Sequence, residues 1–359
     1  MIMKYLLFLL VSLLLITAGY FLSKEGWLNI GKISIKNSNS NPQIETIDPV
    51  NRQIDSPISI NYLRKIKIDS DVYIIEQKLD NGSNYEKYII SYLSEGEKVY
   101  GLLTIPFESK PEDGFPAIVF NHGYIPPKNY STTYNYLSYV DYLARNGFVV
   151  LKIDMRGHGN SEGTATGSYF SSTYTIDLIS ALKSLQKSEL INPKRIGVWG
   201  HSMSGNLVLR SMLVSDEIKA GVIWAGAVYS YEDFGKYRIS DSSYMQRPQQ
   251  QVISHPNRDN NPEIQKLRDN YKEIDFSSDY WRAISLTQNI NYLKNPIQIH
   301  HSADDSVVNV GYSRDLEKVL KDSQKKYEYY EYQGGGHNIT GLYFNEAMKR
   351  TVEFFKENL

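Results

Sequence analysis

The stretch that decides the fold is INPKRIGVWGHSMSG, which covers residues 191–205. Its segment Arg195–Trp199 is a short apolar run typical of a buried strand, and residues 203–214 have the pattern of a helix. Between the two lies a turn of small residues, Gly200-His201-Ser202-Met203-Ser204-Gly205. A tight turn from strand to helix lifts the hydroxyl of its central residue above the sheet, so Ser202 is the candidate nucleophile.

Position 204 departs from the usual form of this turn. Glycine normally stands two residues before and two residues after the nucleophile, whereas this chain has Ser204 followed by Gly205. Serine is small enough for the turn to survive. The alternative interpretation is a Gly/Ser turn in which Ser202 or Ser204 only caps the helix. The motif therefore needs partners elsewhere in the chain.

Short apolar runs alternate with longer helical patterns on both sides of this stretch. The expected strands cover residues 117–120, 148–153, 195–199, 220–225, 297–300 and 327–332, and the expected helices cover 134–146, 174–187, 203–214, 312–320 and 342–358. This alternation predicts an α/β domain, with a mostly parallel sheet and helices on both faces. Partly alternating runs at 66–68, 72–75, 88–92 and 99–105 predict an antiparallel start to the sheet.

Three segments are expected along the chain. Residues 1–30 form a membrane anchor or signal segment, residues 31–60 a polar linker rich in Asn, Ser and Pro, and residues 61–359 the catalytic domain. One gap breaks the strand–helix rhythm, at about 229–291, and it is rich in aromatic residues. A structureless loop of that length is improbable, so we expect a helical cap inserted beside the site.

The N-terminal run Tyr5–Leu22 is almost entirely apolar and is bounded by Lys4 and Lys24. Its length is at the lower edge for a helix that spans a bilayer, and it also fits the apolar part of a signal peptide. We favour an uncleaved anchor with the catalytic domain outside the cytoplasm; the alternative is secretion after cleavage. Lysines beyond the run argue mildly for the opposite orientation.

A serine hydroxyl needs a base that takes its proton, and the base needs an oriented carboxylate. Among seven histidines, His337 follows the last expected strand within Gly334-Gly335-Gly336-His337. The acid should lie on the loop after the preceding strand, where two aspartates are adjacent. Asp305 is preferred because it lies nine residues after Pro296, where such loops usually place the acid, and Asp304 is the alternative.

An oxyanion intermediate needs backbone donors. The first should be the N–H of Met203, directly after the nucleophile. The second should come from the loop Asn121-His122-Gly123-Tyr124, where the N–H of Tyr124 is the best candidate. We interpret His122 as a structural hydrogen-bonding residue, and the position of His158 in the strand order argues against its being the base.

Composition narrows the function classes. The chain has 359 residues, no cysteine, 39 Lys plus Arg against 40 Asp plus Glu, and a formal charge of -1. Without a basic excess, nucleic acid is not expected as a partner. Neither a zinc spacing nor a nucleotide-binding glycine motif occurs, so we expect no metal and no cofactor. The expected partners are a small-molecule ester or peptide substrate and, through the N-terminal run, a membrane.

Several of these stretches together resemble the catalytic domain of the prolyl oligopeptidase (S9) group and its esterase relatives, from about Lys98 onward. They are HGY at 122–124, DMRGHGNS at 154–161, INPKRIGVWGHSMSG at 191–205, the Asp305 loop and GGGH at 334–337. The resemblance implies an α/β-hydrolase fold and a serine hydrolase with Ser202, Asp305 and His337 as its triad.

The resemblance leaves the substrate open. The propeller of the larger peptidases has no room here, because only about 100 residues precede the resembling part, so peptidase specificity does not carry over safely. We expect cleavage of ester or amide bonds through an acyl-enzyme, as in S9 peptidases. One alternative is a carboxylesterase or lipase acting on small or apolar esters. Another is a binding protein that keeps the fold without activity.

Overall fold

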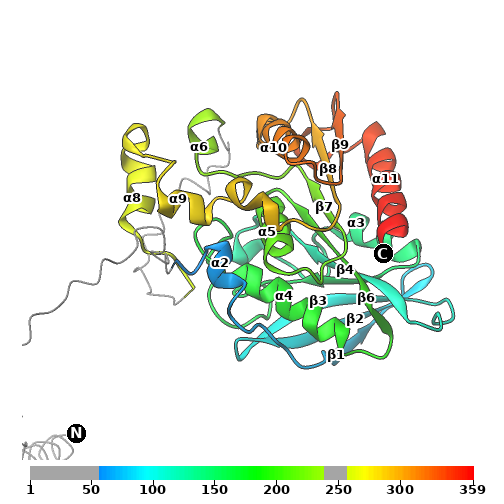
Figure 1. The fold of residues 1–359 in the computed structure, drawn as a ribbon. Coiled ribbons are helices and arrows are strands. Elements are labelled where there is room, and N and C mark those ends of the chain that lie inside the picture. Colours follow the sequence, from blue (N-terminus) through cyan, green and yellow to red (C-terminus); the bar gives the residue numbers. More distant parts are fainter. Residues whose placement is uncertain (1–55, 238–256) are drawn as a thin grey trace, which may run out of the picture. The chain divides into compact units, whose positions relative to one another are not determined.

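A nine-stranded sheet in the order β1-β2-β3-β5-β4-β6-β7-β8-β9 organises residues 56–237 and 257–359, which the computed structural model describes (Figure 1). The strands are β1 Ile74–Leu79, β2 Tyr85–Ser94, β3 Glu97–Pro106, β4 Phe115–Asn121, β5 Val149–Ile153, β6 Ile191–His201, β7 Gly221–Trp224, β8 Ile297–Ser302 and β9 Tyr327–Tyr332. The pairs β1–β2, β2–β3 and β3–β5 are antiparallel, and all later pairs are parallel. The predicted fold class is confirmed.

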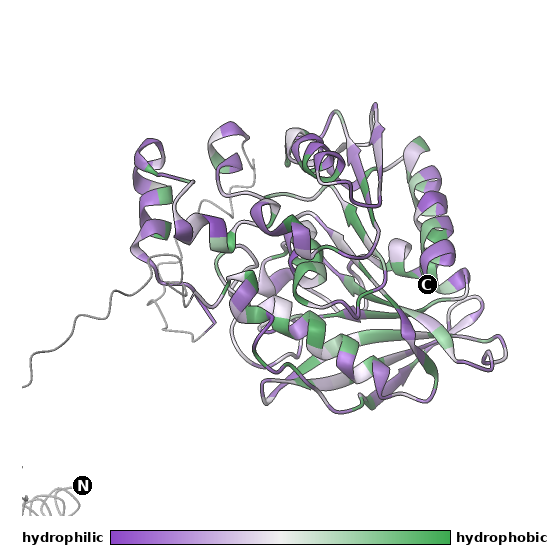
Figure 2. Ribbon diagram, in the orientation of Figure 1, coloured by the Kyte–Doolittle hydropathy of each residue, from purple (hydrophilic) through white to green (hydrophobic). Residues whose placement is uncertain are grey.

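Helices cover both faces of the sheet. They are α2 Ile60–Leu63, α3 Leu137–Arg145, α4 Thr173–Gln186, α5 Met203–Val214, α6 Asp233–Lys236, α8 Pro262–Asp269, α9 Asp279–Ile284, α10 Gly311–Asp322 and α11 Leu342–Asn358, with short 3-10 segments between some of them. One apolar cluster holds the inward residues of α4, α5 and α10, and a second holds those of α3 and α11. Figure 2 shows hydrophilic and hydrophobic residues alternating along α11, as expected for a helix with one face on a sheet.

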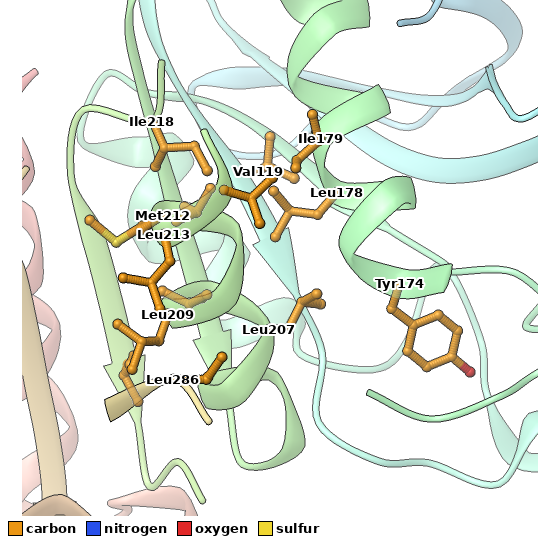
Figure 3. Packing of buried hydrophobic residues seen from close by; sticks show 14 of the residues in the cluster. Val119, Tyr174, Leu178, Ile179, Leu207, Leu209, Met212, Leu213, Ile218 and Leu286 are labelled. Atoms are coloured by element: carbon orange, nitrogen blue, oxygen red, sulfur yellow. The ribbon is translucent and has the colours of Figure 1, made fainter. Parts of the chain in front are cut away.

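The central strands supply side chains to both clusters in alternation. In β4, Val119 lies in the first cluster and its neighbours Ile118 and Phe120 lie in the second. Figure 3 shows Leu178 and Ile179 of α4 beside Val119. A strand that is buried on both faces has a continuous apolar sequence, and it is from such apolar runs that the sequence analysis predicts these strands.

The start of the domain differs from the prediction in two places. Residues 66–68 form no strand, although Ile66 and Ile68 pack partly against the core. Their alternation reports a half-buried face, and alternation alone does not supply a neighbouring strand to pair with. Ile58 and Ile60 are buried in the core, so the described end of the expected linker, residues 56–60, is packed. Two isolated apolar residues are too few to show a period.

The expected cap region is described except for residues 238–256. Its described part contains α6, α8 and α9, and its aromatic side chains are mostly packed inward. Tyr231 and Trp281 are buried with ring centroids 5.2 Å apart, and Tyr280 is buried as well. These rings fill a core and do not form an exposed surface. Whether the region covers the substrate stays a prediction.

The apolar run Tyr5–Leu22 lies outside the described residues. Within residues 56–237 and 257–359, no helix combines the length and the apolar character that crossing a bilayer requires.

The parallel strands bring the predicted site residues to one edge. β4, β6, β8 and β9 run in the same direction, so their carboxyl ends and the loops that follow them meet at the same edge of the sheet. Those loops carry Tyr124, Ser202, Asp305 and His337.

Candidate active site

Ser202 lies in a strained turn between β6 and α5. Its backbone has φ 55° and ψ −119°, a combination that residues other than glycine rarely adopt. Its N–H donates to the carbonyl of Trp224 at 2.8 Å, which ties the turn to β7. The side chain is half-buried. This is the geometry that presents a hydroxyl above a sheet edge, as the sequence predicts.

The departure at position 204 has a structural explanation. The Ser204 hydroxyl is buried and donates to the carbonyl of His122 at 2.5 Å, so it links α5 to the loop after β4. The close approach falls instead on its neighbour. A Cβ at Gly205 would lie 2.5 Å from the Cα of Gly226, and a Cβ at Gly200 would lie 2.5 Å from the carbonyl oxygen of Ser204. Glycine is therefore needed at 200 and 205, and serine fits at 204.

The Gly205→Ala variant is expected to lose about 1–3 kcal/mol of the free energy of unfolding, because the added methyl group meets backbone that cannot move away. Urea unfolding of purified protein measures this loss. Gly334→Ala is the matched control: its Cβ would find only ordinary contacts, from 3.4 Å outward. An equal loss in both variants would contradict the close packing of α5 on the chain after β7.

Asp305, and not Asp304, contacts His337. The Asp305 Oδ2 atom accepts a hydrogen bond from His337 Nδ1 at 2.8 Å. Its Oδ1 atom accepts from the N–H groups of Val307 and Val308 at 2.8 and 2.9 Å, which fixes the carboxylate plane. Asp304 is exposed, and its Oδ1 atom accepts from the N–H of Gly336 at 2.9 Å, so it holds the turn before His337.

A second histidine binds the same carboxylate. His301 is buried; its Nε2 atom lies 3.1 Å from Asp305 Oδ2, and its Nδ1 atom lies 2.7 Å from Ser313 Oγ. Burial by itself raises the pKa of Asp305, but the hydrogen bonds from His301 and His337 outweigh it and hold the pKa well below its usual range. The sequence analysis assigns no role to His301; the spacing of four residues between His301 and Asp305 is the signal that could have found it.

Ser202 and His337 lie on neighbouring loops. His201 Nε2 donates to the backbone carbonyl of His337 at 2.9 Å, and the two imidazole rings lie 4.5 Å apart. In the described part of the chain no hydrogen bond joins the Ser202 hydroxyl to His337. Hydrogen bonds of this kind are often long without substrate and shorten in the bound complex.

The two predicted oxyanion donors are both unused. Met203 is the first residue of α5, and no described residue accepts a hydrogen bond from its N–H or from that of Tyr124. The loop after β4 lies close to the nucleophile, since a Cβ on Gly123 would be 3.1 Å from the Cβ of Ser202. The positive end of α5 also favours negative charge here.

The remaining histidines near the edge are packed into the core. His122 and His158 are buried, with ring centroids 5.1 Å apart, and burial lowers the pKa of both, that of His122 to about 3. Both bond to backbone carbonyls, among them that of Gly123 with His122. Within the two described ranges, no group of three or more metal-ligating side chains occurs.

The fold and this edge define a serine hydrolase of the α/β-hydrolase class. The chain belongs to the serine aminopeptidase S33 family, whose model matches residues 115–341. The superfamily expected from the sequence is confirmed, while the family that matches carries the S33 description.

Two curated relatives show how far the similarity extends. An uncharacterized peptidase, YtmA of Bacillus subtilis, is 25% identical over 276 residues, which are 75% of this chain and 93% of that protein. Human protein ABHD12B is 25% identical over 236 residues, which are 65% of this chain and 58% of that protein.

Solved structures with the same fold include peptidases and esterases. An acylaminoacyl peptidase of Pyrococcus horikoshii has TM-score 0.60 and 23% identity over 77% of this chain. This chain spans only 42% of that peptidase, and 36% of a dipeptidyl peptidase 4 of Porphyromonas gingivalis. An acetyl xylan esterase of Paenibacillus sp. R4 has TM-score 0.56 and 19% identity over 82% of this chain and 91% of its own.

Proposed function

We propose that Ser202, Asp305 and His337 form the catalytic triad of an enzyme that hydrolyses carboxylic esters or peptide amides through an acyl-enzyme. The observation that carries the proposal is the 2.8 Å hydrogen bond from His337 Nδ1 to Asp305, on a loop in contact with the strained turn of Ser202. This bond leaves Nε2 of His337 as the nitrogen that can take a proton from the nucleophile.

The reaction follows from these positions. The Ser202 oxygen attacks the substrate carbonyl carbon while His337 Nε2 takes the hydroxyl proton. The N–H groups of Tyr124 and Met203 stabilise the oxyanion, and collapse of the intermediate expels the alcohol or amine, which receives the proton from His337. Water then attacks the acyl-enzyme while His337 takes its proton, and the Ser202 oxygen receives that proton from His337 as the free acid leaves. Asp305 remains ionised and stabilises the imidazolium.

Two substrate classes have support. The family description and the relative YtmA favour a peptide or an aminoacyl compound. The acetyl xylan esterase, which this chain matches over 91% of its length, favours a small ester. We place peptide amides first and esters second, because the family model rests on this chain's own sequence, whereas the likeness to the esterase is one of fold.

A fluorophosphonate probe tests the nucleophile. The wild-type protein is expected to take one label, and peptide mapping should place it on Ser202; the Ser202→Ala variant should take none. The Ser204→Ala variant is the matched control, since it removes the other hydroxyl of the same turn and should still label. A wild-type protein that stays unlabelled under conditions that label a known serine hydrolase would sink the proposal.

A substrate panel then separates the two classes. The panel compares p-nitrophenyl esters of increasing acyl length with aminoacyl- and dipeptidyl-p-nitroanilides, and Ser202→Ala provides the blank. Higher kcat/KM on the anilides supports a peptidase, and higher kcat/KM on the esters alone supports the second candidate. Rates equal to the blank on every compound would contradict both.

The location of the enzyme is a separate proposal. The apolar run Tyr5–Leu22, flanked by lysines, supports a membrane anchor with the catalytic domain outside the cytoplasm. The full chain should stay with membranes after an alkaline wash, and added protease should digest its catalytic domain in intact cells. Recovery of the full chain in the soluble fraction would contradict the anchor.

A further inference from the structure

We propose that Tyr136 and His201 are positioning residues that connect three segments through one continuous hydrogen-bond chain. The segments are the oxyanion loop (residues 121–124), the serine turn (residues 200–205) and the His337 loop (residues 333–341). The inference rests on the proposed function and deepens it. Neither side chain needs to touch the substrate. Each acts through backbone groups of the loops that carry the reacting residues.

Every donor and acceptor in this hydrogen-bond chain can be assigned. The Gly123 N–H donates to Tyr136 Oη at 2.9 Å, Tyr136 Oη lies 2.7 Å from His201 Nδ1, and His201 Nε2 lies 2.9 Å from the His337 carbonyl. A carbonyl only accepts, so Nε2 carries the imidazole hydrogen. In a neutral ring Nδ1 then accepts, and the tyrosine hydroxyl donates to it. Burial lowers the pKa of His201 to about 3, so the ring is neutral at physiological pH.

At one end, the hydrogen-bond chain orients the backbone of the oxyanion loop. Gly123 directly precedes Tyr124, whose N–H is the proposed second oxyanion donor. The Gly123 backbone packs directly against the two side chains, since a Cβ at Gly123 would lie 2.7 Å from Tyr136 Oη and 3.1 Å from His201 Nδ1. The bond to Tyr136 fixes the peptide plane before Gly123. The next plane, which carries the Tyr124 N–H, is held through the Gly123 carbonyl by His122 Nδ1 at 2.6 Å, so the two bonds together orient this N–H.

At the other end, the chain gives His337 a second point of attachment. Asp305 binds the ring of His337, while His201 binds its backbone carbonyl. The loop around it has little regular structure: Gly335, Gly336 and Ile339 all have positive φ, and only one 3-10 turn, Gly336–Asn338, lies between them. Bonds from outside the loop therefore decide where the ring stands.

The backbone of Tyr136 supports a positioning role. Its φ of 62° and ψ of 17° put a bulky residue in the left-handed region, directly before α3. Glycine or asparagine would adopt this conformation at lower cost. Such strain persists where the surrounding structure requires the side chain to lie in one place. Here that place is the gap between Gly123 and His201.

The Tyr136→Phe variant of the full-length chain tests the proposal. We expect kcat on the best panel substrate to fall about 10-fold or more, with KM changed less than about 3-fold, because misplaced oxyanion donors weaken the transition state and not the bound substrate. The inhibition constant of a trifluoromethyl ketone analogue, which forms a tetrahedral adduct on serine, should rise in proportion to the fall in kcat/KM. A merely structural role would not produce this proportionality.

Tyr142→Phe is the matched control. It makes the same change within α3, the helix that Tyr136 directly precedes, and no described residue hydrogen-bonds its hydroxyl. Its kcat should stay within about 2-fold of wild type. Unchanged kcat in Tyr136→Phe, with wild-type protein that labels normally with fluorophosphonate, overturns this inference alone. Absence of label on the wild type overturns the proposed function instead.

Substitutions at His201 test the chain independently of Tyr136. A glutamine side chain has one acceptor and one donor group side by side, so His201→Gln can bond both Tyr136 Oη and the His337 carbonyl. His201→Leu can bond neither. We expect His201→Gln to retain at least about 5-fold more kcat than His201→Leu at comparable melting temperatures. Equal activity of the two variants would overturn the inference.

Discussion

Asp305→Asn is expected to lower kcat about 10⁴-fold, whereas Asp304→Asn, one residue earlier, is expected to lower it less than about 3-fold. The Asp305 carboxylate accepts a hydrogen bond from the protonated Nδ1 of His337 at 2.8 Å. An asparagine amide would present a donor there and favour the other tautomer, in which Nε2 already carries the hydrogen and cannot take the Ser202 proton. Among the described residues, Asp304 hydrogen-bonds only the backbone N–H of Gly336, on the loop that carries His337.

Initial rates at saturating substrate measure both variants, and urea unfolding checks that each is folded. Asparagine keeps the acceptor oxygen for the N–H groups of Val307 and Val308, so the loop should survive in Asp305→Asn. A larger loss in Asp304→Asn than in Asp305→Asn would reverse the assignment of the acid.

Acidification from pH 7 to pH 5 is expected to destabilise the fold strongly through three buried histidines. Burial lowers the pKa of His122, His201 and His300 to about 3 each. At pH 5 the unfolded chain protonates these rings, whose ordinary pKa is about 6.5, and the folded chain does not. The unfolded state binds more protons, so stability is complete above about pH 7 and falls as the pH drops toward 3. Between pH 7 and pH 5, each ring lowers the free energy of unfolding by about 2 kcal/mol.

Urea unfolding at pH 7 and pH 5 measures the loss, and His300→Gln isolates one ring. His300 bonds Tyr332 and Gln298 inside the second apolar cluster and plays no part in the proposed mechanism. The difference in unfolding free energy between the two pH values should shrink by about 2 kcal/mol in this variant. The comparison cancels the titration of all other groups. An unchanged difference would show that His300 titrates normally in the folded protein.

Much of the fold could be predicted because its central elements carry strong periodicity. The helices at 203–214 and 342–358 and the strand at 327–332 have the predicted bounds. The weakest predictions concern the edges of the domain, where Ile66 and Ile68 alternate without a neighbouring strand and Ile58 packs within a polar stretch. In both places tertiary packing, and not local pattern, decides the structure.

The candidate site divides in the same way. The pairing of Asp305 with His337 could be predicted because strand order and loop position constrain both residues. Tyr136 and His201 could not, because their contact depends on a left-handed backbone at Tyr136 that its residue type disfavours. Roles that arise from backbone strain leave no pattern in the local sequence.

The strain at Ser202 separates two pressures that act on this chain. A side chain at φ 55° and ψ −119° costs about 1–3 kcal/mol, and glycine would relieve most of that cost. A chain selected for folding alone would therefore place glycine at this position. The turn carries serine instead, at the expense of durability. Selection for thermal stability alone, without selection for activity, is therefore expected to replace Ser202 with glycine early and so to abolish catalysis.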